Sequence, residues 1–156
     1  MKMDIPRGFA CIGLVNPKFA ANVGSVLRAA HCYGAAQVSI ARCRSKDLRF
    51  KSNTPQTHLH MPTFIVDDVL DQLPYGCQVV AVDLIDGATG LPEFDHPARA
   101  MYVFGPEDGT LGRSITDRAQ HVVSIPTRNC MNLAATVNVV LYDRLAKSLA
   151  RAAVHA

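Results

Sequence analysis

Short apolar runs alternate with longer segments of helical periodicity along most of this chain. The run from Phe9 to Val15 is closed by a turn, and apolar or small residues recur at helical spacing from Phe19 to Tyr33. The segment Gln37 to Ala41 then alternates as a second strand. Strands that are apolar throughout are typical of a parallel sheet covered on both faces. The alternation therefore predicts an α/β fold with a mostly parallel sheet and helices on both faces.

The same pattern continues to the end of the chain, and its 156 residues are the size of one domain, here spanning 1–156. Thr63 to Leu73 is predicted to begin as a strand and continue as a helix, and Asp86 to Pro97 reads as a turn-rich connection. A final helix from about Asn132 carries an apolar stripe that suits either the core or a partner subunit. The remaining predictions are strands over Cys77 to Ile85, Ala100 to Phe104 and His121 to Ile125, and a short helix over Arg113 to Ala119.

Composition excludes several classes of protein. With 49% hydrophobic and 19% charged residues, the chain is not expected to be disordered. Its longest apolar stretch, Leu133 to Tyr142, is far shorter than the roughly 20 residues that cross a bilayer. The first residues show no apolar region of signal-peptide length, so we expect a cytoplasmic protein.

Cysteine and histidine usage predicts neither disulfides nor a metal. The five cysteines form an odd set without a Cys-x-x-Cys pair, which favours reduced, mostly buried thiols. His58 and His60 are alternate residues with no signal for a third ligand, which is typical of a surface loop.

A basic segment between Arg42 and Pro62 has little periodicity and is expected to be a loop with at most some helix. Its five cations face a lone Asp47, and such a segment is a natural place for RNA phosphates, although a solvated loop is an equal alternative. The net charge of +3 permits a nucleic-acid partner without requiring one. The predicted RNA-binding residues are Arg42, Arg44, Lys46, Arg49 and Lys51.

Three loops that follow predicted strands carry unusual glycine or polar chemistry. They span 16–28, 105–112 and 126–132. Parallel α/β sheets bind ligands beyond the carboxyl ends of their strands, so the site is expected where these loops meet. The glycine patterns of ATP and NAD proteins are missing, and no Gly-x-Ser-x-Gly elbow supports a hydrolase.

In this order, the three loops resemble the motifs of the SpoU or TrmH family of RNA ribose methyltransferases. Asn22 to Arg28 is similar to the first motif, Val103 to Asp108 to the second, and Ile125 through Asn132 to the third. The resemblance covers nearly the whole chain and is greatest to the short TrmL-like members, which modify the tRNA wobble nucleotide. It implies a C-terminal trefoil knot that holds the cofactor, roughly over residues 77–156, and a homodimer.

The implied activity is transfer of a methyl group from S-adenosylmethionine to a ribose 2′-hydroxyl of RNA. The resemblance favours tRNA, with rRNA as the alternative, and it implies neither a DNA partner nor a membrane. A catalytically silent, knotted RNA-binding module is the second hypothesis, because Cys130 stands where many relatives have serine and the third loop is short. A generic nucleotide-binding domain is the third, and it would leave Arg28 and Asn132 apart in space.

The resemblance also implies roles for individual residues. Arg28 is expected beside the target nucleotide, where its permanently protonated guanidinium suits a phosphate clamp or an alkoxide stabiliser better than a base. Asn22 and Asn132 have an alternative role as helix caps, and Glu107 as a turn-stabilising carboxylate. The implied catalytic residues are Arg28, Asn22, Glu107 and Asn132. The implied cofactor-binding residues are Val82, Gly105, Ile125, Cys130 and Met131.

Overall fold

A seven-stranded sheet organises the computed structural model, which describes residues 8–46 and 57–154. The strand order is β3-β2-β1-β6-β4-β7-β5, and every neighbouring pair is parallel, which confirms the predicted α/β class. The strands are β1 (Phe9–Val15), β2 (Gln37–Ala41), β3 (Thr63–Val66), β4 (Gln78–Val82), β5 (Thr89–Gly90), β6 (Arg99–Phe104) and β7 (His121–Ser124).

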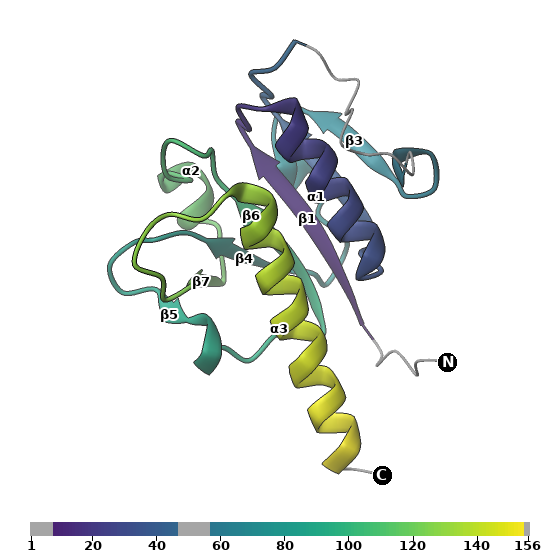
Figure 1. Ribbon diagram of the computed structural model, residues 1–156, viewed down its shortest axis with the longest axis vertical. Helices are drawn as coiled ribbons and strands as arrows, with labels where there is room; N and C mark the ends of the chain where they lie inside the picture. Colours follow the sequence, from purple (N-terminus) through teal and green to yellow (C-terminus); the bar gives the residue numbers. More distant parts are fainter. Residues whose placement is uncertain (1–7, 47–56, 155–156) are drawn as a thin grey trace.

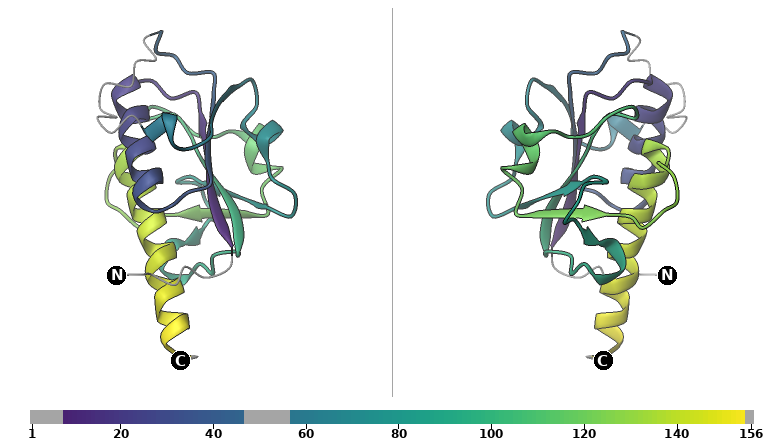
Figure 2. Two further views of the ribbon diagram at one scale, coloured as in Figure 1. Left: turned by 90° about the vertical axis from the view of Figure 1, so that its right-hand side faces the viewer. Right: turned by 90° about the vertical axis from the view of Figure 1, so that its left-hand side faces the viewer.

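Helices cover both faces of the sheet, as predicted, but unequally. The two long helices, α1 (Ala20–Cys32) and α3 (Leu133–Val154), lie side by side on one face (Figures 1 and 2). The other face carries only short turns, α2 (Arg113–Thr116) and the 3-10 turn η2 (Val69–Gln72). Two further 3-10 turns, η1 (Thr57–Leu59) and η3 (Leu91–Glu93), complete the described elements.

Alternation along the central strands divides the core into two layers. On β1, Ile12 and Leu14 pack in the cluster that contains α1 and α3, whereas Cys11 packs with Val69 and Ile115 on the opposite face. All five inner residues of β1 are buried because this strand has helical cover on both sides. The central strands are therefore held rigidly, and their carboxyl ends provide fixed anchor points for the loops that follow.

Several predicted boundaries are wrong in detail. The predicted strand from Cys77 to Ile85 is shorter, since the chain leaves the ladder after Val82. The segment predicted as helical after Thr63–Val66 forms only the four-residue η2, which Asp68 caps by accepting from the Leu70 amide. The connection predicted as turns between 86 and 97 includes β5, which pairs with β7.

The stripe on α3 serves the core along only part of its length. Leu133, Val137, Val140 and Leu141 are buried, but Leu149 is 43% exposed, because the last turns of α3 project beyond the sheet (Figure 1). Over residues 8–46 and 57–154, none of the helices has both the length and the hydrophobicity that crossing a bilayer requires.

The cysteines are less buried than predicted. Cys11 and Cys77 are buried in the sheet core, whereas Cys32 at the end of α1 and Cys130 in the loop after β7 are exposed. All five thiols are free. The trefoil knot stays a prediction, since strand order and register do not by themselves fix how one loop passes through another.

A buried polar network holds the middle of α3 against the amino-terminal edge of the sheet. The imidazole of His96 contacts the Tyr102 hydroxyl through Nδ1 at 2.6 Å and the Asp143 carboxylate through Nε2 at 2.8 Å. Lys147 pairs with the same carboxylate at 2.8 Å, and Arg144 donates to the Pro97 carbonyl at 2.6 Å. Burial lowers the pKa of His96 below its ordinary value, and this effect outweighs the opposing attraction of Asp143.

This depressed pKa predicts a pH-dependent stability. The unfolded chain takes up a proton on His96 below about pH 6.5, whereas the folded chain does so only at a lower pH, so protonation favours the unfolded state as the pH falls. The thermal unfolding midpoint should therefore decrease more between about pH 7.5 and pH 5 for the wild type than for His96→Gln, which does not titrate there. Equal decreases for both proteins would show that His96 is not the responsible group.

Candidate functional site

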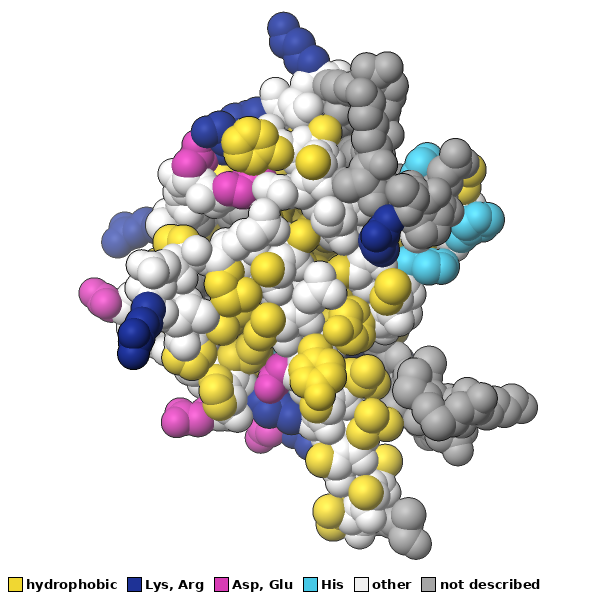
Figure 3. Space-filling view, viewed as in Figure 1, with side chains coloured by type: hydrophobic (Ala, Val, Ile, Leu, Met, Phe, Trp, Pro, Cys, Tyr) yellow, Lys and Arg dark blue, Asp and Glu magenta, His cyan; other side chains and the backbone are white. Residues whose placement is uncertain are grey.

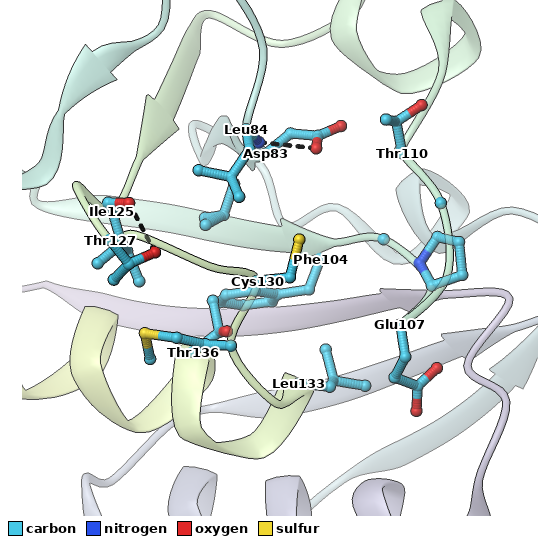
Figure 4. A pocket seen from close by; sticks show the side chains of 15 residues that line it. Asp83, Leu84, Phe104, Glu107, Thr110, Ile125, Thr127, Cys130, Leu133 and Thr136 are labelled. Atoms are coloured by element: carbon cyan, nitrogen blue, oxygen red, sulfur yellow. Dashed lines mark hydrogen bonds between the residues drawn. The ribbon is translucent and has the colours of Figure 1, made fainter.

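The carboxyl ends of β1, β4, β6 and β7 meet at one edge of the sheet, and a pocket of about 220 Å³ opens there. Figure 4 shows Glu107 and Ile125 at opposite ends of this pocket, with Cys130 and Leu133 between them. The structure thus gathers every residue that was predicted to bind a cofactor. Those that line the pocket are Val82, Gly105, Ile125, Cys130 and Met131, together with Glu107.

The pocket combines apolar walls with an accessible backbone. Val82, Ile125, Met131 and Leu133 supply apolar surface. At Gly105 an added Cβ would lie 3.1 Å from the Leu111 nitrogen, a tight contact that the backbone could relieve only by shifting a few tenths of an ångström. A glycine therefore suits the close fold-back of the 105–111 loop, and its backbone lines the pocket.

Asp83, which sequence reasoning missed, holds this loop in place. It follows β4 directly, and its Oδ2 accepts a 2.8 Å hydrogen bond from the Leu111 amide. Its Oδ1 accepts from the Leu84 amide, also at 2.8 Å (Figure 4). One carboxylate thus ties the end of β4 to the folded-back loop after β6. A single aspartate after a strand is a common turn residue, so no sequence signal distinguished it.

Removing this tie should weaken ligand binding in the pocket. A hydrogen bond from a backbone amide to a carboxylate contributes about 1.5–3 kcal/mol, and about 1.4 kcal/mol corresponds to a tenfold change in affinity. If the pocket binds the cofactor that the resemblance implies, Asp83→Ala is expected to bind S-adenosylhomocysteine about tenfold more weakly, measured by calorimetry. Asp83→Asn retains one acceptor oxygen, so its affinity should lie between those of the wild type and Asp83→Ala. If both variants bind the ligand as tightly as the wild type, Asp83 does not support the site.

At one end of the pocket, one side chain from the first turn of α1 and two from the loops after β6 and β7 form a chain of hydrogen bonds. The Asn22 amide donates through Nδ2 to Glu107 Oε1 at 2.7 Å, and the Asn132 amide donates through Nδ2 to Asn22 Oδ1 at 2.9 Å. These residues are 85 and 110 positions apart in the sequence. The first, second and third motif loops therefore meet in one place.

Each bond in this chain fixes the direction of the next. A carboxylate only accepts, so it turns the Asn22 NH2 group toward Glu107 and leaves the Asn22 oxygen to accept from Asn132. The Asn132 oxygen accepts in turn from the Ala134 amide at 2.9 Å, so that Asn132 is also the N-cap of α3. The exposed Asn132 amide keeps its second N–H, which can donate to a ligand at the rim of the pocket.

Glu107 is an ionised acceptor in this arrangement. Burial opposes its ionisation, but hydrogen bonds from the Asn22 side chain and from backbone amides, including those of Lys18 and Phe19, outweigh burial and lower its pKa. The Lys18 amide lies 2.8 Å from Oε2. Glu107 therefore holds the backbone just before α1, whose N-cap residue Phe19 makes no side-chain capping bond.

The basic segment joins the site through an exposed ion pair. The Arg44 guanidinium donates to Asp108 Oδ2 at 3.1 Å, and the Lys18 ammonium lies 3.4 Å from the same oxygen. Hydrogen bonding to Arg44 is the largest cause that lowers the pKa of Asp108 to about 2. Of the other predicted RNA-binding residues, Arg42 and Lys46 are exposed, whereas Arg49 and Lys51 lie outside the described residues.

Of the predicted catalytic residues, Glu107 lines the pocket, Asn22 and Asn132 join it through hydrogen bonds, and Arg28 is not part of that chain. It is exposed on α1, six residues beyond Asn22 and so about 9 Å further along the helix axis. Like Asn22 and Asn132, it is not among the residues that line the pocket. Its role beside the target nucleotide stays a prediction.

A second cavity, of about 390 Å³, lies at the opposite edge of the sheet around Ala98, Arg144 and Lys147. Its cations already have partners, since Arg144 donates to the Ala98 carbonyl at 2.8 Å and Lys147 to the Leu91 carbonyl at 2.6 Å. Nor do the described residues assemble three His, Cys, Asp or Glu side chains into a group that could hold a metal ion. The pocket around Gly105 is the better candidate site.

The fold and the pocket define a class, the ligand-binding α/β proteins. Comparison with known proteins identifies the family within this class. The model of the SpoU rRNA methylase family matches residues 10–142, so the chain belongs to that family. No curated protein sequence matches it significantly.

Solved structures share the fold at low sequence identity. The SpoU methyltransferase AviRb from Streptomyces viridochromogenes, in complex with the cofactor AdoMet, has a TM-score of 0.79 and 18% identity over 95% of this chain and 64% of its own. The TrmH/SpoU tRNA modifying enzyme of A. aeolicus has a TM-score of 0.81 and 18% identity over 95% of this chain and 79% of its own.

A third structure, described as giving insights into the 2-OH methylation of C/U34 on tRNA, has a TM-score of 0.77 and 23% identity over 93% of both chains. By contrast, the chain spans 63% of AviRb in another of its structures and 59% of an rRNA methyltransferase from Sinorhizobium meliloti. These likenesses establish the common fold.

Proposed function

We propose that this chain methylates a ribose 2′-hydroxyl of RNA with S-adenosylmethionine as the methyl donor. The observation that carries the proposal is the hydrogen-bonded chain Glu107–Asn22–Asn132 at the rim of the pocket around Gly105. This chain joins side chains from all three segments that resemble the family motifs. A chance resemblance would not predict hydrogen bonds among these side chains. Any parallel α/β sheet brings such loops to one edge, so the argument rests on the specific hydrogen bonds among Glu107, Asn22 and Asn132 and on the family to which the chain belongs.

The pocket residues suit S-adenosylmethionine. Apolar walls at Val82, Ile125 and Met131 fit an adenine ring, and the open backbone at Gly105 offers peptide groups for its polar edge. All of these residues lie within the segment of about 77–156 that we propose as the cofactor-binding, knotted part of one domain. The AdoMet complex of AviRb supports the choice of ligand. When bound, S-adenosylmethionine supplies an electrophilic methyl group on its sulfonium.

This chain's own residues would position the ribose and stabilise its oxygen. The remaining N–H of Asn132 can hold the hydroxyl oxygen in line, and the Arg28 guanidinium can stabilise the charge that develops on this oxygen as its proton passes to solvent water. Glu107 is ionised and already accepts hydrogen bonds from Asn22 and from backbone amides, so its role is to brace the loops rather than to remove a proton.

We favour tRNA as the substrate and the cytoplasm as the place of action. The structure concerned with tRNA position 34 covers the same share of both chains, so its protein is close in size to this one. The TrmH/SpoU structure of A. aeolicus is also a tRNA modifying enzyme. Ribosomal RNA is the alternative substrate, as the family's description indicates.

We also propose a homodimer that covers the outer face of α3. Figure 3 shows hydrophobic side chains gathered along this helix on the face that α1 and α3 share. On α3, the side chain of Val139 is 38% exposed, that of Tyr142 61% and that of Leu149 43%. Apolar patches of this kind, if covered by a second copy, would no longer contact water.

Calorimetric titration with S-adenosylhomocysteine, followed by transfer of labelled methyl groups to unfractionated tRNA, tests the proposal. We expect saturable binding near one ligand per subunit and RNA-dependent incorporation of label. Binding of tRNA without binding of S-adenosylhomocysteine would instead favour the silent RNA-binding module.

Arg28→Ala is expected to reduce methyl transfer at least about a hundredfold while S-adenosylhomocysteine affinity changes only a few-fold, because Arg28 lies outside the pocket. Mixing Arg28→Ala with Asn132→Ala subunits then locates the arginine. If Arg28 of one subunit serves the site of its partner, random mixing makes half of the dimers heterodimers, each with one intact site of two. About a quarter of the wild-type activity then returns. Full activity in Arg28→Ala would exclude the residue from the mechanism.

A further inference from the structure

Phe19 is an exposed aromatic residue on a fixed backbone. It is the N-cap of α1, and its carbonyl accepts from the amides of Asn22 at 3.1 Å and Val23 at 3.2 Å. Its side chain is nevertheless 50% exposed. The Lys18 ammonium lies 5.2 Å from the centre of its ring, so a cation already rests beside the aromatic face.

The backbone just before this ring is tied to both the pocket and the basic segment. The Lys18 amide binds Glu107, which lines the pocket. The Arg44 amide donates to the Pro17 carbonyl at 2.9 Å, so the basic segment is held next to the start of α1. The two residues that precede Phe19 are thus tied to the candidate site and to the cations predicted to bind RNA.

We propose that Phe19 is a stacking platform for a nucleobase of the RNA substrate, at or beside the nucleotide whose ribose enters the site. This inference rests on the proposed function and adds a recognition element to it. An aromatic ring can stack on any base, so the platform would position single-stranded RNA without selecting its sequence. Lys18 and Arg44 would meet the flanking phosphates, which compete with Asp108 for both cations.

The absence of tryptophan from the sequence makes this platform directly observable. Phe19→Trp introduces the sole indole of the chain, and stacking on a nucleobase quenches indole fluorescence. Titration of Phe19→Trp with unfractionated tRNA, in the presence of S-adenosylhomocysteine, is expected to quench the emission with the same saturation as tRNA binding followed by filter retention.

Tyr75→Trp is the matched control. Tyr75 is 97% exposed and lies in the turn before β4, at the amino-terminal edge of the sheet, so its indole should not respond to tRNA. Equal quenching of both variants would show nonspecific contact and overturn the proposal. Emission of Phe19→Trp that changes with protein concentration but not with tRNA would assign the ring to a subunit interface and also overturn it.

Phe19→Leu separates stacking from simple hydrophobic contact. It keeps an apolar side chain but removes the ring, and should weaken tRNA binding about tenfold while S-adenosylhomocysteine affinity stays unchanged. If the wild type binds and methylates tRNA but Phe19→Leu binds it equally well, only the platform is wrong. If the wild type neither binds S-adenosylhomocysteine nor methylates tRNA, the proposed function itself fails.

Discussion

Gly105→Val is expected to lower the affinity for S-adenosylhomocysteine about a hundredfold or more. Even the Cβ of an alanine would lie 3.1 Å from the Leu111 nitrogen and 3.3 Å from the Thr110 carbonyl carbon, and both are backbone atoms that cannot swing away. Overpacking costs about 1–3 kcal/mol, and a hundredfold change in affinity corresponds to about 2.7 kcal/mol. We therefore expect the larger valine side chain to push the loop outward and displace the backbone that faces the pocket.

Gly90→Ala provides the control for this experiment. The Cβ at Gly90 would meet nothing closer than Pro92 Cδ at 3.8 Å, so its affinity should match the wild type. Circular dichroism should show native secondary structure for both variants. A Gly105→Val protein that is folded and binds S-adenosylhomocysteine normally would show that the ligand does not use this pocket.

Asn22→Asp is expected to reduce methyl transfer about a hundredfold with little change in S-adenosylhomocysteine binding. The substitution preserves shape but replaces the NH2 group that Glu107 accepts from with a second carboxylate, so like charges face each other across the 2.7 Å contact. Asn132 then loses its fixed partner, and small misplacements of a positioning group can cost about a hundredfold in rate.

The double variant Asn22→Asp with Glu107→Gln tests this directional argument. A glutamine at 107 can donate through its amide to the new carboxylate while its oxygen still accepts from the Lys18 amide. We expect partial recovery of the rate relative to Asn22→Asp alone. Strictly additive losses would mean that the two side chains act independently, against the chain of hydrogen bonds described here.

Local patterns predicted the elements around the site well. The predicted strands Phe9 to Val15 and Gln37 to Ala41 match β1 and β2 in the structure, because a buried parallel strand is an apolar run bounded by turn residues. The two-residue β5 was missed because its pairing with β7 depends on a distant strand rather than on its own residues. Strand order likewise depends on long-range packing.

The composition of the pocket was predictable only through the family resemblance, whereas its internal contacts were not predictable at all. The role of Asp83 depends on its hydrogen bond with the Leu111 amide, which forms only when the loop after β6 folds back. The participation of Arg44 in an ion pair with Asp108 also depends on two loops meeting. Such contacts join residues 28 to 110 positions apart, over which no periodic pattern carries information.

Identification of the methylated nucleoside tests the central claim most directly. Unfractionated tRNA labelled by the protein from S-adenosylmethionine is digested to nucleosides and separated by chromatography with mass detection. The account predicts label in a 2′-O-methylnucleoside and resistance of the adjoining phosphodiester to alkaline hydrolysis, since a methylated 2′-oxygen cannot attack it. Label on a base, or a labelled linkage that alkali cleaves, would contradict ribose methylation.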